Sequence, residues 1–526
     1  MPAAPVFLIG FPGAGKSAVG AQVAAALGRP FVDLDEAIAA TAGRPVPEMV
    51  VADEPAFRRL EAATLAAVAA RADLPVVATG GGAAIHGDNL ARMQGAGHVI
   101  ALDVPLADAL VRVAPGSRPL LQRPAPEVEA LYRRRQPVYR RAPATVATAG
   151  HGTERVAAAV LAAVRRLEAA PRRQPWVTLE ERSYPIDIGD AALPVALAPW
   201  VRPGRHAVVA DANLASWIDP VVAALRGAGA DVHVETVAPG EASKSLAEYG
   251  RLADALVAAR LDRGSTVFAL GGGVVGDLAG FVAATLYRGI DVVHLPTTLV
   301  AMTDSAIGGK TAIDLPAGKN LLGAFHQPRA VIAHLPVLAT LPPRERQAGF
   351  GELWKYALLD GDGLWRAVAA VAPWAATTAP PPAELTAVIA AAATLKAAIV
   401  SADERERSGQ RVLLNLGHTL GHAIEAAAGW ALLHGEAVGL GLRAAARVSC
   451  RLGLAGPELE ARVVEGLTAT GLPTDLDARL TPDVVSRVRV DKKRSGGKVA
   501  FVACAAPGDC QVVDLPTADL ADLLRP

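Results

Sequence analysis

The chain has 526 residues, 52% of them hydrophobic, and its 52 lysines and arginines are balanced by 52 acidic residues. This length exceeds one ordinary core and predicts several structural units of about 100–200 residues each. The charge balance provides no field toward nucleic acid or an anionic membrane, so we expect neither as a partner and expect anion recognition to be local.

The ends of the chain and its cysteines indicate the compartment. No basic residue precedes the apolar run Val6–Gly10, so no signal peptide is visible. No apolar run approaches the roughly 20 residues of a membrane helix. Cys450, Cys504 and Cys510 are odd in number and form no CxxC pair, which is typical of free thiols in a reducing cytosol. We therefore expect a cytoplasmic protein.

Residues 1–168 alternate short apolar runs with helical periods. The runs are Val6–Ile9, Phe31–Leu34, Val76–Ala78 and Val99–Leu102. This alternation predicts βαβ units, and hence a parallel sheet with flanking helices. Residues 169–178 (AAPRRQPWVT) combine prolines and arginines between two patterned regions, which predicts a linker.

The alternation resumes over residues 179–335 and then fades. Its apolar runs are Ala207–Ala210, Val232–Val237, Val267–Leu270 and Val292–Leu295. They predict a Rossmann-like α/β domain. Residues 336–526 are dominated by helical periods, apart from a possible hairpin near Val499–Val513. We expect a mainly α-helical domain there, belonging with the second α/β domain.

A phosphate-binding loop lies at the start of the chain. Gly10–Ser17 reads GFPGAGKS, after a predicted strand and before a predicted helix. Backbone N–H groups of such a loop cradle phosphates, Lys16 can reach the β- and γ-phosphates, and the Ser17 hydroxyl can hold Mg²⁺. The alternative is a glycine-rich turn that matches by chance, which the flanking elements disfavour. The ATP-binding residues are expected to be Gly13, Ala14, Gly15, Lys16, Ser17 and Ala18.

Charged residues in the same region suit a small polyhydroxylated acid. Asp33 and Asp35 end the second strand, and Gly80, Gly81 and Gly82 follow the third. Arginine forks can hold a carboxylate and Asp35 can accept from hydroxyl groups, although each arginine alone fits a solvated surface. The arginines are Arg58 on a helix, Arg118 in SRPLL and Arg135 in RRRQPVY.

With these motifs, residues 1–168 resemble shikimate kinase, which implies phosphoryl transfer from ATP with Mg²⁺ to shikimate. The resemblance implies that Arg112 stacks on adenine and that Arg118 reaches both substrates from a closing lid. It implies catalytic roles for Lys16, Asp35 and Arg118. The implied shikimate ligands are Asp35, Arg58, Gly81 and Arg135.

A second glycine turn and a histidine cluster mark the rest of the chain. Ala269–Gly280 (ALGGGVVGDLAG) is a candidate pyrophosphate turn, and Asp211 with Asn213 suits either a nucleotide ribose or a helix cap. The candidate metal ligands are Glu352, His418, His422 and His434. A carboxylate with imidazoles suits Zn²⁺ with an open coordination position, and the residues alone do not choose three ligands among the four.

Lysines are scarce in this chain, yet several stand in motif-like stretches. They are Lys310, Lys319, Lys355, Lys396, Lys492 and Lys493. Each could be an ordinary surface charge, but a compact ammonium also suits phosphate binding and proton transfer.

Together these stretches resemble 3-dehydroquinate synthase over about residues 180–526; among them are APGEASKSL, GELWKY, NLGHTLGHAIE and LLHGEA. The resemblance implies Zn²⁺ (or Co²⁺) on Glu352, His418 and His434, with His422 left for the substrate phosphate. It implies catalytic roles for Lys310, Lys355 and His422. The implied substrate residues are Asp304, Lys310, Asn320, Lys355, Lys396, Arg411, Asn415, His422 and Lys492, with Arg288 acting across a homodimer interface. The implied NAD⁺ contacts are Asp211, Asn213, Glu241, Lys244, Gly272, Gly273, Asp277, Thr297, Thr298, Lys319, Thr340 and Leu341.

The resemblance further implies a reaction in which NAD is regenerated. The substrate is 3-deoxy-D-arabino-heptulosonate 7-phosphate, a seven-carbon sugar-acid phosphate. A transient oxidation permits phosphate elimination, the hydride returns, and an aldol closure gives 3-dehydroquinate. Two alternatives remain, namely a polyol dehydrogenase using the same NAD⁺ and metal, and a scaffold protein with a degenerate kinase domain. Net NADH release would identify the first, and a lack of ATP consumption the second.

Overall fold

The computed structural model describes residues 3–113, 119–169, 174–429, 431–491 and 497–525. Arg118 and Lys492, both expected at sites, lie outside the described residues, as do residues 170–173 of the expected linker. The chain divides into two compact units: Met1–Glu181 with Ala397–Ala402, and Arg182–Lys396 with Asp403–Pro526.

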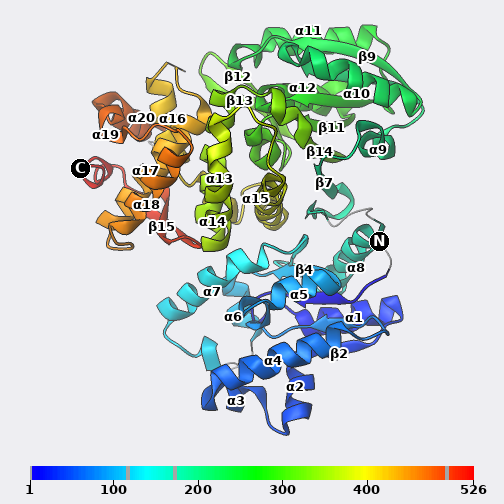
Figure 1. The fold of residues 1–526 in the computed structure, drawn as a ribbon, viewed down its shortest axis with the longest axis vertical. Coiled ribbons are helices and arrows are strands. Elements are labelled where there is room, and N and C mark those ends of the chain that lie inside the picture. Colours follow the sequence, from blue (N-terminus) through cyan, green and yellow to red (C-terminus); the bar gives the residue numbers. More distant parts are fainter. Residues whose placement is uncertain (1–2, 114–118, 170–173, 430, 492–496, 526) are drawn as a thin grey trace. The chain divides into compact units, whose positions relative to one another are not determined.

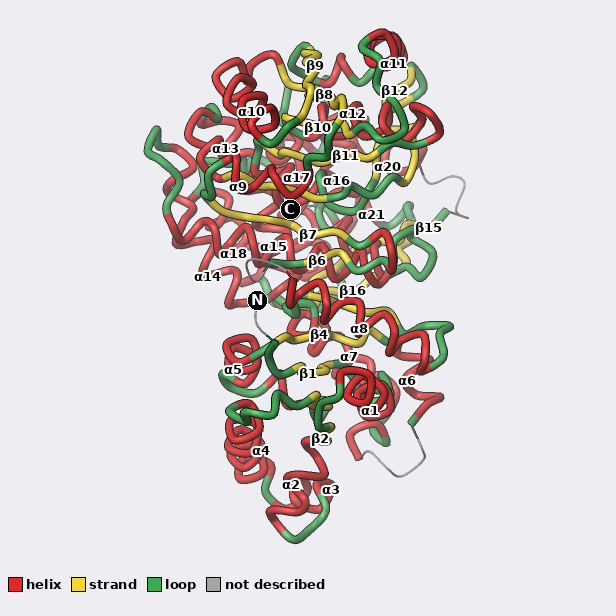
Figure 2. The backbone as a smooth tube through the Cα atoms, turned by 90° about the vertical axis from the view of Figure 1, so that its right-hand side faces the viewer, coloured by secondary structure: helices red, strands yellow, loops and turns green. Residues whose placement is uncertain are grey.

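The first unit is built on a parallel five-stranded sheet in the order β2-β3-β1-β4-β5 (Figures 1 and 2). Its strands are β1 (Val6–Ile9), β2 (Phe31–Asp33), β3 (Val76–Ala78), β4 (His98–Asp103) and β5 (Ala144–Ala147). Its longer helices are α1 (Lys16–Leu27), α2 (Leu34–Ala42), α3 (Val46–Ala52), α4 (Glu54–Ala69), α5 (Asn89–Ala96), α6 (Leu106–Arg112), α7 (Ala125–Tyr139) and α8 (Thr153–Ala169).

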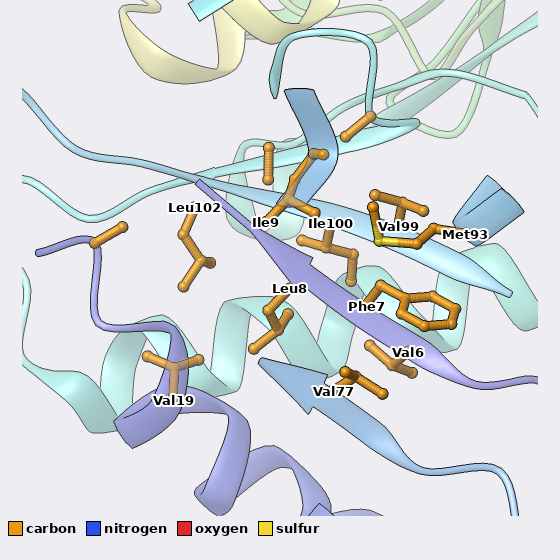
Figure 3. Close-up of a cluster of buried hydrophobic side chains, with 14 of the residues drawn as sticks. Val6, Phe7, Leu8, Ile9, Val19, Val77, Met93, Val99, Ile100 and Leu102 are labelled. Carbon is orange, nitrogen blue, oxygen red and sulfur yellow. The ribbon is translucent and has the colours of Figure 1, made fainter. Parts of the chain in front are cut away.

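Strand β1 lies at the centre of the sheet, and its sequence is apolar at every position instead of alternating with polar residues. Val6, Phe7, Leu8 and Ile9 are all fully buried. Figure 3 shows them among side chains from neighbouring strands and from helices, including Val19 of α1. A strand covered on both faces buries every side chain, which is why Val6–Ile9 is an uninterrupted run of apolar residues.

The second unit opens with six strands of a seven-stranded sheet, paired parallel in the order β7-β14-β11-β10-β8-β9. These strands are β7 (Tyr184–Gly189), β8 (Gly204–Asp211), β9 (Ala230–Val237), β10 (Thr266–Gly271), β11 (Asp291–Pro296) and β14 (Ala330–His334). Alternate residues of β8 enter two cores: Ala207 and Val209 face α11 (Leu246–Ala258) and α12 (Gly273–Thr285). Val208 and Ala210 face α9 (Leu193–Leu197) and α10 (Ala215–Gly227). A hairpin of β12 (Lys310–Leu315) and β13 (Gly318–Phe325) follows β11.

The remainder of this unit is mainly helical, as the sequence predicts. Its helices are α13 (Pro343–Asp360), α14 (Asp362–Val371), α15 (Ala383–Ala402, of which residues 397–402 are grouped with the first unit), α16 (His418–Ala427), α17 (His434–Arg451), α18 (Glu458–Ala469), α19 (Leu476–Arg479), α20 (Pro482–Asp491) and α21 (Leu520–Leu523). Strands β15 (Lys498–Ala506) and β16 (Asp509–Pro516) pair antiparallel, which confirms the expected hairpin. The predicted fold class is thus confirmed: a P-loop α/β domain, a Rossmann-like α/β domain and a mainly helical part.

The structure corrects three expectations. The second strand ends at Asp33 rather than Leu34, because the Asp33 carboxylate accepts the N–H groups of Asp35 and Glu36 and starts a helix. Strands β5, β7 and β14 were not predicted, because no apolar run was identified at their positions in the sequence. Helix α15 has 20 residues and, by length and composition, is apolar enough to cross a membrane. The prediction that no apolar run approaches this length is therefore wrong. Within the protein, 67% of the most apolar window of α15 is buried, as in a core helix.

Candidate functional sites

The phosphate-binding loop of the first unit joins β1 to α1. Gly13 and Gly15 have φ of 84° and 87°, a left-handed conformation that favours glycine. The Lys16 ammonium donates to the carbonyl oxygens of Gly10 (2.8 Å) and Phe11 (3.1 Å), so it lies over the loop. The Ser17 hydroxyl donates to Asp33 at 2.6 Å. The loop therefore presents a lysine at a helix N-terminus, where phosphate binds favourably. The Ser17–Asp33 pair offers oxygen ligands of the kind that Mg²⁺ prefers.

A pocket in the same unit gathers four of the residues expected to hold the acid substrate. Asp35, Arg58, Gly81 and Arg135 line it. The other lining residues are Pro12, Val46, Pro47, Val50, Phe57, Glu61, Gly80, Gly82, Leu120 and Leu121. Arginines and a carboxylate in a partly apolar pocket suit a small hydroxylated acid.

Glu61 is a pocket residue that sequence reasoning did not assign. Its side chain is 1% exposed and receives a 2.8 Å hydrogen bond from Arg58. Burial raises the pKa of Glu61, against the lowering effect of the Arg58 charge. The signal in the sequence is the three-residue spacing on helix α4, which brings the two side chains onto one face.

Arg112, expected to stack on adenine, is held at the end of a strand. Its guanidinium donates to the hydroxyl and the carbonyl of Thr148, at 3.0 and 2.9 Å. Thr148 follows β5, so Arg112 lies at the carboxyl edge of the parallel sheet, where ligands of such sheets bind.

In the second unit the glycine turn begins α12. Gly272 caps this helix after β10, and the Thr297 N–H donates to the Gly271 carbonyl at 3.0 Å. A Cβ at Gly272 would lie 3.2 Å from the Thr298 side chain, so both expected threonines border the turn. The turn therefore sits at the carboxyl edge of two adjacent parallel strands, β10 and β11, the usual position of a nucleotide site.

Charged residues surround the outer side of this turn. Lys244, 4% exposed, donates to Asp277 at 2.8 Å and to Asn320 at 2.5 Å, and lies 3.6 Å from Glu241. Burial raises the pKa of Asp277 to about 6, against the Lys244 charge. Asp211 accepts the N–H of Asn213 at 2.9 Å, so its carboxylate caps the turn after β8.

Two further residues expected near NAD⁺ lie before α13. The Thr340 hydroxyl donates to Val337 (2.8 Å) and accepts from the indole N–H of Trp217 (3.2 Å). The Leu341 carbonyl accepts from Arg346 at 2.8 Å. Trp217 is a contact that sequence reasoning missed.

Glu352, His418 and His434 converge in the helical part. They come from α13 and from the first residues of α16 and α17. The Nε2 atoms of His418 and His434 lie 3.3 and 3.2 Å from Glu352 Oε1, and one ligand atom from each residue lies within 4.8 Å of the others. Glu352 is fully buried. One carboxylate and two imidazoles fit Zn²⁺ with an open position.

His422, the fourth candidate, stands beside this group. Its ring centre is 5.2 Å from that of His418 and 5.8 Å from that of His434. Burial lowers the pKa of His422 to about 4, so its imidazole is neutral near pH 7. The carboxylates of Glu352 and Glu425, by contrast, raise the pKa of His434 to about 10, against the effect of burial.

Asp304 is the centre of a second buried charge cluster. Its Oδ1 lies 3.1 Å from Lys355 and 2.8 Å from Lys396, and accepts from the Tyr356 hydroxyl. Burial opposes the ionised form, yet the two ammonium groups hold the pKa of Asp304 below its usual range. Burial lowers the pKa of Lys396 to about 8. Lys355 is also 2.5 Å from Glu352, so the two clusters adjoin. Tyr356 was not predicted, although it directly follows Lys355.

The remaining expected substrate residues are spread more widely. Lys310 forms an ion pair with Glu406, whose carboxylate is also 3.8 Å from Arg411. Lys319 lies 3.1 Å from Glu425 and 3.3 Å from Glu241. Arg288 and Asn415 are both exposed. Arg288 has a φ of 70°, as part of a turn after α12.

Comparison with known proteins identifies the families of both regions of the chain. Residues 12–165 match the family model described as shikimate kinase. Residues 234–348 and 349–494 match those described as 3-dehydroquinate synthase N-terminal and C-terminal. The 3-dehydroquinate synthase of Caulobacter vibrioides is 48% identical over 353 residues, which cover 64% of this chain and 93% of that protein. The enzyme of Rhodospirillum rubrum is 47% identical over 347 residues, covering 63% and 89%.

Among solved structures, one similar chain is ValA, the 2-epi-5-epi-valiolone synthase of Streptomyces hygroscopicus subsp. jinggangensis 5008, with NAD⁺ and Zn²⁺ bound. It is 28% identical with a TM-score of 0.61, and the match covers 66% of this chain and 97% of that one.

Proposed function

Because this chain belongs to the 3-dehydroquinate synthase family and carries a shikimate kinase domain before that region, we propose that each reaction is performed by the side chains assembled in its own unit. The chain is a bifunctional enzyme of aromatic amino acid biosynthesis. We assign the kinase to residues 1–168, a linker to 169–178, the NAD-binding domain to 179–335 and the metal- and substrate-binding domain to 336–526. The observation that carries the synthase assignment is the convergence of Glu352, His418 and His434.

The kinase site transfers a phosphoryl group from ATP with Mg²⁺ to a ring hydroxyl of shikimate. Lys16 exchanges its two loop carbonyls for phosphate oxygens, and Ser17 ligates the metal ion. Arg58 and Arg135 bind the shikimate carboxylate, and Asp35 accepts from the hydroxyl groups, since all three line one pocket. This chemistry needs positioning and neutralisation of charge more than covalent help from the protein.

The synthase site is assigned to the two adjoining clusters of the second unit. When bound, Zn²⁺ polarises a substrate hydroxyl and NAD⁺ takes and returns a hydride. Glu352, His418 and His434 are the proposed metal ligands. Lys355 touches both Glu352 and Asp304, so it can hold a substrate oxygen beside the metal site. The N–H group of the neutral His422 imidazole can donate a hydrogen bond to the substrate phosphate.

Further contacts with the substrate anions and with NAD⁺ follow from the charges nearby. Lys310 and Arg411 share the Glu406 carboxylate, and we propose that a substrate anion replaces it. We propose that Lys396 and Asn320 also contact the substrate. The proposed NAD⁺ site runs from the Gly272–Gly273 turn past Lys244 and Asp277 toward Lys319.

We further propose a cytoplasmic homodimer formed through the synthase domain. Arg288 supports this, since it is exposed in a turn and suits a phosphate in the neighbouring copy. Mixing inactive Arg288→Ala and Lys355→Ala proteins should restore part of the synthase activity if one copy completes the site of the other. A monomer in light scattering, or no recovery in mixed dimers, would contradict the assignment.

Assays on the purified chain test the two reactions together. ADP should form only when shikimate is present. Phosphate should be released from 3-deoxy-D-arabino-heptulosonate 7-phosphate without net accumulation of NADH. Stoichiometric NADH without phosphate would instead identify a polyol dehydrogenase.

A further inference from the structure

Glu425 contacts the proposed metal ligand His434 on the side opposite Glu352. His434 Nε2 lies 3.2 Å from Glu352 Oε1, while its Nδ1 lies 3.4 Å from Glu425 Oε2. His418 makes a similar pair of contacts: its Nε2 faces Glu352, and its Nδ1 lies 3.1 Å from the carbonyl oxygen of Leu416. Both rings therefore direct the same nitrogen to the metal position, one held by a backbone carbonyl and the other by a carboxylate.

The second oxygen of Glu425 belongs to a different network. Glu425 Oε1 lies 3.1 Å from the ammonium of Lys319, which is 3.3 Å from Glu241. Glu241 in turn is 3.6 Å from Lys244, beside the glycine turn proposed for NAD⁺. The Glu425 side chain is only 8% exposed, whereas those of Lys319 and His434 are 28% and 35% exposed. One carboxylate thus joins the proposed metal site to the proposed cofactor site.

We propose that Glu425 is a positioning residue that orients His434 for the metal ion and Lys319 for NAD⁺. This rests on the proposed function, because it requires His434 to be a metal ligand and Lys319 a cofactor contact. A carboxylate that accepts the Nδ1–H of an imidazole fixes its tautomer, leaves the Nε2 lone pair for the metal and prevents the ring from turning. Its second oxygen keeps the flexible Lys319 side chain in one place, which lowers the entropy lost when a ligand binds.

The test compares Glu425→Ala and Glu425→Gln with Glu465→Gln, an exposed carboxylate on α18, all in the full-length protein. Zinc affinity is measured by competition with a chromophoric chelator, and NAD⁺ affinity by calorimetry on the metal-free protein. We expect zinc binding about 10–100-fold weaker in Glu425→Ala, since partners of ligand histidines have effects of this size. Glu425→Gln should lie between it and the wild type, because the amide oxygen still accepts a hydrogen bond. NAD⁺ affinity should fall in both variants, and Glu465→Gln should match the wild type.

Two further measurements separate positioning from general destabilisation. The visible absorption of the Co²⁺-loaded protein should change in Glu425→Ala, because the ring of His434 is no longer fixed. Wild-type zinc affinity in Glu425→Ala or Glu425→Gln would overturn the proposal, as would wild-type NAD⁺ affinity for the role at Lys319. If Glu425→Ala fails to fold, the nearly isosteric Glu425→Gln decides.

Matched ligand variants separate this inference from the assignment of the metal site. Glu352→Ala and His418→Ala should each weaken zinc binding more than Glu425→Ala. If they do so and the Glu425 variants do not, only the role of Glu425 fails. If neither ligand variant weakens zinc binding, the metal site itself is wrong.

Discussion

A Cβ atom on Gly435 would lie 1.6 Å from the carbonyl oxygen of Ala348, so the start of α17 touches α13 directly. Gly351 makes the reciprocal approach, since a Cβ there would lie 2.2 Å from the Gly435 carbonyl oxygen. These two glycines stand next to His434 and Glu352 in the sequence. The close approach of the two helices is therefore what brings the carboxylate and the imidazole within 3.2 Å.

The change Gly435→Ala should disrupt the metal site. The added methyl group must push α17 from α13, at a cost of about 1–3 kcal/mol for overpacking, and it separates His434 from Glu352. Bound zinc per chain and synthase activity should both fall, while shikimate phosphorylation continues. Gly250→Ala is the control, because nothing lies within 4 Å of its added Cβ. Full zinc occupancy in Gly435→Ala would show that the helix contact does not set the site.

Lys16→Ala should abolish phosphorylation of shikimate. The ammonium at the phosphate-binding loop is the charge positioned for the transferring group, and loss of one such group lowers kcat by about 10²–10³-fold. ADP release coupled to shikimate measures this loss. Synthase activity of the same preparation is the internal control, and its loss in a folded protein would contradict the separation of the two sites.

The two metal requirements should be separable. Chelator treatment should stop both reactions, and Mg²⁺ alone should restore only the kinase, because Mg²⁺ does not compete for a site rich in imidazole. Zn²⁺ or Co²⁺ should then restore the synthase, less effectively in His434→Ala. Synthase recovery with Mg²⁺ in zinc-free buffer would exclude Glu352, His418 and His434 as a zinc site.

Glu61→Gln should weaken shikimate binding more than it slows phosphoryl transfer. The buried Glu61 carboxylate orients Arg58, and hydrogen bonds to charged groups contribute about 1.5–3 kcal/mol. The KM for shikimate should therefore rise more than tenfold, with a smaller change in kcat. Glu129→Gln, an exposed side chain on α7, is the matched control. Equal kinetics for the two variants would remove Glu61 from the site.

Synthase activity should fall as the pH rises through about 8. Burial lowers the pKa of Lys396 to about 8, so below this pH the ammonium is charged and holds Asp304 and the substrate, and above it the charge is lost. Lys396→Arg should move this fall to higher pH, because a guanidinium stays protonated. The profile of kcat/KM against pH tests the assignment, and an identical alkaline limb in both proteins would contradict it.

The sequence by itself determined the fold class and the local motifs. The loop Gly10–Ser17 needs only glycines between a strand and a helix, so its geometry follows from consecutive residues. The apolar run Val6–Ile9 similarly predicts a strand that is buried on both faces. The polar partners were less visible. Glu61 stands outside the quoted motifs, and Tyr356 and Glu425, although they end the stretches GELWKY and NLGHTLGHAIE, acquire a role only through a neighbour.

Tertiary structure decided which histidines face Glu352. The spacing of His418 and His422 places both on one helix face, and from the sequence His422 was as good a ligand as His434. In the fold, His418 and His434 each begin a helix, and the packing of α13, α16 and α17 directs their Nε2 atoms to one carboxylate oxygen. A spacing along the chain fixes only neighbours on one helix, whereas a metal site depends on the distances between helices, which are set by contacts such as that of Gly435 with Ala348.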